Sequence, residues 1–145
     1  MIGRAVDSSI SREWYRYVWG NVLELLRSTD MDLVNLETTL TNSNRMVAKT
    51  FNFKASPDKV KCLSDAHITV ANLANNHILD FSEEGLIETI QTLKKAGIEY
   101  VGAGSNDKEA SKPVILIRKD IRIGIMGFTD NEPTWKAGAS RSGIK

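Results

Sequence analysis

The stretch HITVANLANNHILDFSEEGLIETIQTLKKAGIEYV, residues 67–101, predicts a strand, a helix and a second strand in succession. Residues 67–73 are mostly apolar and partly β-branched, which is typical of a buried strand. A helical period of apolar residues follows over 83–96, and Gly97 stands where a helix commonly ends in a left-handed residue. Residues 98–101 form the second short apolar run. A strand, a helix and a strand in this order favour a parallel pair of strands joined by a crossover helix.

The pattern extends in both directions from this unit. Ser82 is predicted to cap the helix over 83–96, and Ser56-Pro57 marks the start of another helix that runs to residue 66. The other expected elements are a helix over 11–26, a strand over 32–37, a loop over 38–47, a half-buried strand over 50–54, a helical turn over 107–111, and a hairpin of 113–118 with 121–128. Residues 129–145 are polar and rich in Gly and Ser, with no clear element. Together these predict one α/β domain, a three-layer sandwich around a mainly parallel sheet.

Composition narrows the classes of function. The chain has 145 residues, 41% hydrophobic and 26% charged, with a formal net charge of +1. The balance gives no electrostatic case for a nucleic-acid or anionic-membrane partner. The sequence shows neither an apolar run of membrane-spanning length nor an apolar signal-peptide core at its start, and it leaves the localisation open. The lone cysteine, Cys62, excludes an internal disulfide and is interpreted as a small buried residue.

Two predicted strands end in residues that can carry chemistry. Asn35-Leu36-Glu37 closes the first strand, and Asn75-Asn76-His77 follows the strand over 67–73. Ligand sites in such sheets lie beyond the carboxyl ends of the strands. A carboxylate, carboxamides and an imidazole at neighbouring strand ends suit a hard-metal site with a catalytic histidine.

Each of these residues also has a plainer interpretation. Asn and His after a strand are common turn residues, and Glu37 taken alone is more typical of a solvated loop carboxylate than of a metal ligand. Asp80 can orient the imidazole of His77 or cap the helix that follows. The sequence pattern alone does not decide between these alternatives.

Several spaced motifs resemble those of the capsule-synthesis family CapA/PgsA of poly-γ-glutamate biosynthesis. They are ANNHILDFSEEGLIETIQTLKKAGIEYVGAGSNDKEASKP at 74–113, VNLETTLT at 34–41, and KTFNFKA at 49–55. Gly3-Arg4 and Val6-Asp7 are similar to the segment after the family's first strand, whereas Lys54 stands where an Arg is usual. The resemblance covers the chain up to about residue 129 and implies a fold like that of calcineurin-like metallophosphatases.

The resemblance also implies roles for particular residues. Asn76 takes the place of the metal-binding Asn, His77 that of the catalytic His, and Glu37 that of an acid bridging two metals, with Asp80 beside the imidazole. Asn75 replaces the Gly of the family motif. The implied cofactors are divalent metal ions, Mn, Fe or Zn. The residues expected to bind a phosphoester or anionic-polymer substrate are Arg4, Asn35, Lys49 and Asn75.

The sequence departs from the family pattern at both ends. The Gly-Asp pair that closes the family's first strand would lie before Met1, and the later His motifs would lie beyond Lys145. His67 and His77 are the only histidines. We therefore expect a domain truncated at both ends, inactive as given, whose exposed sheet edge favours self-association. The leading hypothesis is a domain resembling metal-dependent phosphoesterases. The alternatives are a non-catalytic module that binds or exports an anionic polymer, and a small α/β domain whose Asn-Asn-His is only a turn.

Overall fold

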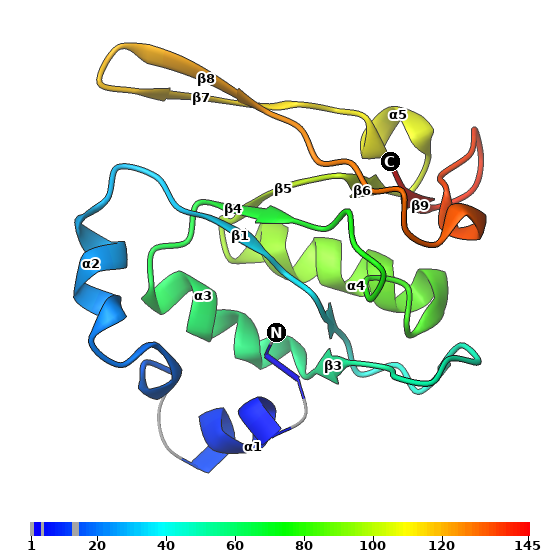
Figure 1. Ribbon diagram of the computed structural model, residues 1–145, viewed down its shortest axis with the longest axis horizontal. Helices are drawn as coiled ribbons and strands as arrows, with labels where there is room; N and C mark the ends of the chain where they lie inside the picture. Colours follow the sequence, from blue (N-terminus) through cyan, green and yellow to red (C-terminus); the bar gives the residue numbers. More distant parts are fainter. Residues whose placement is uncertain (1, 4, 13–14) are drawn as a thin grey trace.

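The computed structural model describes residues 2–3, 5–12 and 15–145 (Figure 1). The helical elements are α1 (Ala5–Arg12), η1 (Tyr17–Trp19), α2 (Val22–Ser28), η2 (Pro57–Val60), α3 (Lys61–Asp65), α4 (Ser82–Lys95), α5 (Asp107–Ala110) and η3 (Pro133–Trp135). The strands are β1 (Leu33–Asn35), β2 (Thr39–Leu40), β3 (Lys54–Ala55), β4 (Val70–Asn72), β5 (Glu99–Val101), β6 (Ala103–Gly104), β7 (Val114–Arg118), β8 (Ile121–Ile125) and β9 (Gly143–Ile144). The protein is mixed α/β, as predicted.

A small parallel sheet organises the molecule. Its strand order is β1-β4-β5, and Asn35 of β1 lies opposite Asn72 of β4. Strands β2 and β3 form a second, two-stranded parallel sheet. The pairs β6-β9 and β7-β8 are antiparallel. The predicted parallel pairing through the crossover helix is thus confirmed for β4, α4 and β5, and the predicted hairpin is β7-β8.

The hydrophobic core lies between the β1-β4-β5 sheet and helices α3 and α4 (Figure 1). Leu86, Ile90 and Leu93 of α4 are buried, and Ala71 of β4 belongs to the same cluster. The helix ends as predicted: Gly97 has φ +71° and donates its N–H to Lys94 O. The hairpin β7-β8 lies on the other side of the sheet from α3 and α4 (Figure 1). None of the helices in the described ranges is both long and apolar enough to cross a membrane.

The predicted helix over 11–26 is wrong. The described chain instead has α1 ending at Arg12, a 3₁₀ turn over Tyr17–Trp19, and α2 starting at Val22. Gly20, between these turns, has φ +52°, a conformation that a right-handed helix cannot contain. The apolar period was present, but the backbone turns at this glycine; residues 13 and 14 lie outside the described ranges.

Three further expectations need correction. The strand predicted over 50–54 is only Lys54–Ala55, and its partner β2 falls inside the predicted loop over 38–47. Ser82 does not cap α4, because its hydroxyl donates to Arg45 O at 2.7 Å and the N-cap position is Phe81. The segment 129–145 contains η3 and β9, where no element was expected. In each case contacts between distant segments override the local pattern.

Candidate functional site

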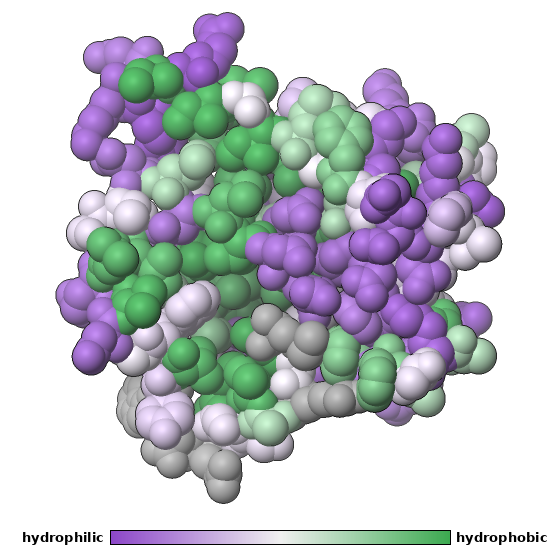
Figure 2. All heavy atoms as spheres, viewed as in Figure 1, coloured by the Kyte–Doolittle hydropathy of each residue, from purple (hydrophilic) through white to green (hydrophobic). Residues whose placement is uncertain are grey.

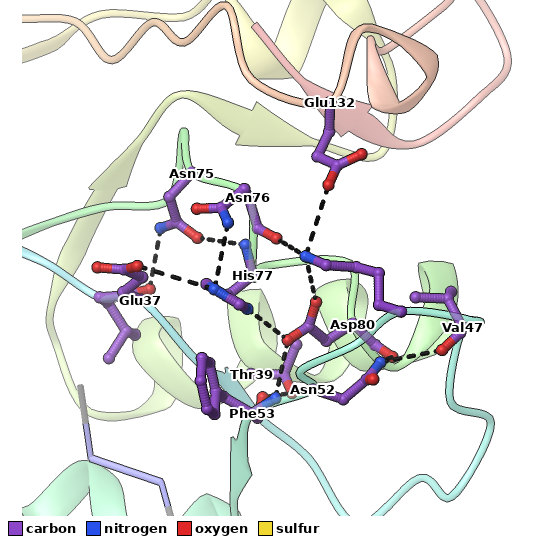
Figure 3. A network of polar contacts seen from close by, with 12 residues as sticks. Glu37, Thr39, Val47, Asn52, Phe53, Asn75, Asn76, His77, Asp80 and Glu132 are labelled. Carbon is purple, nitrogen blue, oxygen red and sulfur yellow. Dashed lines mark hydrogen bonds and ion pairs between the residues drawn. The ribbon is translucent and has the colours of Figure 1, made fainter.

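The buried carboxylate of Asp80 lies at the centre of a polar network (Figure 3). Its side chain is 0% exposed. Oδ2 accepts a hydrogen bond from His77 Nδ1 at 2.7 Å and another from the backbone N–H of Phe53 at 2.8 Å. Because a carboxylate can only accept here, Nδ1 of His77 carries a proton, and Nε2 points away from Asp80. The Phe53 ring packs on the imidazole with 4.3 Å between ring centroids. The orientation and tautomer of His77 are therefore fixed.

The other nitrogen of His77 faces the ends of β1 and of the loop after β4. Nε2 lies 3.9 Å from Glu37 Oε1 and 3.2 Å from the Asn76 side-chain nitrogen. His77 is 9% exposed and Glu37 37% exposed at the side chain. The two strand ends whose polar residues the sequence singled out therefore meet at one point, as expected from the parallel pairing of β1 and β4.

Asn75 and Asn35 join the two strand ends. The side-chain nitrogen of Asn75 donates to Asn35 Oδ1 at 3.2 Å and to Leu36 O at 3.1 Å, and its Oδ1 accepts from the His77 backbone N–H at 3.0 Å. Asn35 also accepts from Asn72 at 3.1 Å. These amides hold Glu37 beside His77 through contacts within the protein.

Lys49 reaches the site from the loop between β2 and β3. Its ammonium donates to Asp80 Oδ1 at 3.1 Å and to the backbone O of Asn76, and lies 3.6 Å from Glu132 Oε1. The indole of Trp135 lies beneath it, 4.8 Å from Nζ to the ring centroid. These groups lie along an open cleft. The cleft is lined by Ala48, Lys49, Thr50, Phe51, Asn76, His77 and Glu132.

The structure thus gathers all but one of the residues singled out from sequence: Asn35, Glu37, Lys49, Asn75, Asn76, His77 and Asp80. Arg4 lies outside the described residues. Sequence reasoning missed Glu132 and Trp135, which come from the segment with no predicted element. It also missed Asn52, whose amide donates to Val47 O at 3.0 Å and to Asp80 O at 3.1 Å. No local signal marks these residues, because only the tertiary fold brings them to the site.

A divalent metal ion is implied by the resemblance, and the donors present fit part of its coordination sphere. Glu37 supplies a carboxylate and Asn76 an amide, which are accepted ligands for such ions, and the imidazole of His77 lies beside both. The Nδ1–H of His77 bonded to a carboxylate is also the usual support for a histidine beside a metal. Across residues 2–3, 5–12 and 15–145, however, no cluster of three or more His, Cys, Asp or Glu side chains could hold an ion. The donors in these ranges would therefore account for only one side of such a centre.

Cys62 takes no part in this site. It is 0% exposed, and burial raises the pKa of its thiol to about 11. The thiolate form needed for nucleophilic or metal-binding chemistry is therefore scarce at neutral pH.

Comparison of the sequence with known families places the chain in a class of bacterial capsule-synthesis proteins. The model of the family described as "Bacterial capsule synthesis protein PGA_cap" matches residues 1–145, and the chain belongs to this family.

Curated relatives support the assignment. A "Capsule biosynthesis protein CapA" of Bacillus anthracis is 33% identical over 134 residues, which cover 90% of this chain and 33% of that protein. A "Probable polyglutamine synthesis accessory protein" of Mycobacterium tuberculosis is 36% identical over 138 residues, 90% of this chain and 36% of that protein. A "PGA biosynthesis protein CapA" of Bacillus subtilis is 28% identical over 133 residues, 90% of this chain and 35% of that protein. The chain spans about a third of the length of these relatives.

Proposed function

We propose that this segment carries one side of a metal-dependent phosphoester hydrolase site within a capsule or poly-γ-glutamate synthesis protein. In this proposal Glu37 and Asn76 are metal ligands. His77, held by Asp80, transfers a proton at Nε2 or stabilises charge on a phosphoryl group. A bound divalent ion would supply Lewis-acid stabilisation of that charge. The proposal includes the finer fold assignment, a three-layer sandwich of the calcineurin-like metallophosphatase type.

The charge balance of the site is the observation that carries the proposal. In the described part of the chain, the carboxylates of Asp80 and Glu132 flank the ammonium of Lys49, and a third carboxylate, that of Glu37, lies beside His77. Such a cleft repels an anion and attracts a cation. A phosphoester would bind there only if metal ions first reversed the sign of the local charge.

The same observation disfavours the alternative, a non-catalytic module that holds an anionic polymer. That function needs unpaired cations along the cleft, whereas Lys49, the cation that lines it among the described residues, is engaged by Asp80 and Glu132. The names of the curated relatives refer to polymer synthesis, so we retain the polymer module as an outcome of the test.

Titration of the 145-residue chain with Mn²⁺, followed by electron paramagnetic resonance, tests the ligand assignment. We expect weak binding that Glu37→Gln and Asn76→Ala each reduce by about tenfold or more, since each removes a proposed ligand. His77→Asn should leave the affinity near that of the wild type. His67→Asn is the matched control, because His67 is the other histidine and is exposed.

Turnover provides the second test. This chain alone should not hydrolyse a chromogenic phosphoester. In a protein of the relatives' full length that carries this segment, His77→Asn should lower hydrolysis by about 10²–10⁴-fold, the usual contribution of general acid–base catalysis, while metal content stays normal. Binding of Mn²⁺ that is indifferent to Glu37→Gln, or full activity in His77→Asn, would overturn the proposal. Binding of poly-γ-glutamate without Mn²⁺ would favour the polymer module.

A further inference from the structure

We propose, building on the function proposed above, that Lys49 is a positioning residue for the His77–Asp80 pair and does not contact the substrate. This assignment replaces the expectation from sequence that Lys49 binds an anionic substrate.

The first step concerns the ammonium itself. A lysine has three N–H donors, and those of Lys49 face three oxygens of the protein. Two accept hydrogen bonds, the backbone O of Asn76 and Asp80 Oδ1, and the third belongs to Glu132 at 3.6 Å. Trp135 covers a further side of the ammonium, and only 19% of the side chain is exposed. An external anion would have to displace Glu132 to reach it.

The second step concerns what these contacts hold. Lys49 links three segments that are distant in sequence: its own loop, the loop after β4, and the segment after β8. Within the described residues, Lys49 is the partner that hydrogen-bonds to Asp80 Oδ1, while Oδ2 serves His77 and the Phe53 N–H. Without Lys49, one oxygen of a fully buried carboxylate has no partner. We expect the carboxylate to rotate and to release the single tautomer of His77.

Lys54 offers a matched control. Its ammonium also donates to two oxygens, Ser43 O at 2.7 Å and Asn44 Oδ1 at 2.8 Å, and lies 4.8 Å from the centroid of an aromatic ring, that of Phe81. These partners include no carboxylate and none of the residues of the His77–Asp80 pair. Lys54→Met therefore removes a lysine with two hydrogen bonds and a ring contact but with no carboxylate partner.

Long-range ¹H–¹⁵N correlation of the histidine rings in the metal-free 145-residue chain at neutral pH tests the proposal. In the wild type, His77 should show a single tautomer, with the proton on Nδ1, the nitrogen that faces Asp80. Lys49→Met should lose this single pattern and show both tautomers, while Lys54→Met and Lys49→Arg keep it. The measurement needs neither metal nor turnover, so failure of the proposed hydrolase function would leave it interpretable.

Two results would overturn the proposal. One is a Lys49→Met protein in which His77 keeps the wild-type pattern. The other needs no variant: titration of the wild type with inorganic phosphate should leave the side-chain resonances of Lys49 unmoved, and a saturable shift at Lys49 would show that it contacts anions directly. The phosphate titration decides the question even if Lys49→Met fails to fold.

Discussion

At the scale of single residues, Asp80 links the stability of the protein to the geometry of its site. Its buried carboxylate accepts hydrogen bonds from Lys49, His77 and the backbone N–H of Phe53. Burying a charge is costly unless it is paired and hydrogen-bonded, and here every oxygen has a partner. The same bonds that satisfy the carboxylate also orient the imidazole, so the site depends on interactions that the folded state needs.

We therefore predict that Asp80→Asn destabilises the protein by about 3 kcal/mol, because removing one member of a buried ion pair leaves the other uncompensated. For a domain of this size the midpoint of thermal unfolding should fall by roughly 6–12 °C. Asp65→Asn is the control: Asp65 pairs with Arg16 at the surface, with side chains 34% and 57% exposed, and its loss should cost at most about 1 kcal/mol. Equal effects of the two substitutions, measured by calorimetry, would contradict the prediction.

At the scale of elements, the sequence predicted the helices and strand ends that are determined by a local pattern of residues. The apolar period of α4 and the glycine at 97 defined that helix, and the polar ends of β1 and β4 pointed to the partners Glu37 and His77. The break at Gly20 escaped because the apolar period continues across it. Strands β2 and β3, of two residues each, carry too little pattern to recognise. Glu132 reaches Lys49 because β9 pairs with β6 and returns the C-terminal segment to the sheet, and such a long-range pairing leaves no local trace.

The junction of β5, β6 and α5 contains a second polar element, centred on Glu109. Its carboxylate accepts from Tyr100 Oη at 2.5 Å, from Lys94 at 3.2 Å, and from the backbone N–H and hydroxyl of Ser105 at 2.8 and 2.6 Å. Burial raises the pKa of Glu109, but the hydrogen bonds from Ser105, Tyr100 and Lys94 outweigh burial and hold the pKa at about 2. The Glu109 carboxylate therefore links α5 to Tyr100 of β5 and to Ser105, which follows β6.

The depressed pKa predicts a dependence of stability on pH. The unfolded value is near 4.5, so the contribution of Glu109 is complete above about pH 5 and is lost as the pH falls towards 2. Glu109→Gln should flatten this part of the curve when unfolding by urea is measured from pH 6 to 2.5. Glu99→Gln is the control, because Glu99 is exposed and shows no side-chain hydrogen bond in the described part of the chain. An unchanged slope in Glu109→Gln would contradict the prediction.

At the scale of the whole molecule, hydrophobic residues gather on the face seen in Figure 2. Leu33 of β1 is 50% exposed, and Ile115, Ile117 and Ile121 of the hairpin are 54%, 62% and 64% exposed. Strand β1 stands at an outer edge of its sheet, and within the described residues the backbones of β7 and β8 pair as strands only with each other. Exposed apolar edges of this kind can pair with further strands. The self-association expected from the sequence therefore stays a prediction, with a second copy of this chain as the partner.

The hairpin is the stronger of these edges, because each of its strands has five residues whereas β1 has three, and longer apolar edges pair more readily. We predict that the wild-type chain associates with itself as its concentration rises, and that Ile117→Lys lowers this association, because a lysine on an edge strand must lose hydration when another strand pairs with it. Sedimentation velocity over a range of concentrations measures the effect.

Leu25→Lys on α2 is the matched control: Leu25 is 65% exposed but lies on a helix, which offers no unpaired backbone edge. If both substitutions reduce association equally, general surface hydrophobicity and not strand pairing drives it; if the wild type sediments as a single monomer at every concentration, the exposed edges do not recruit a second copy at all.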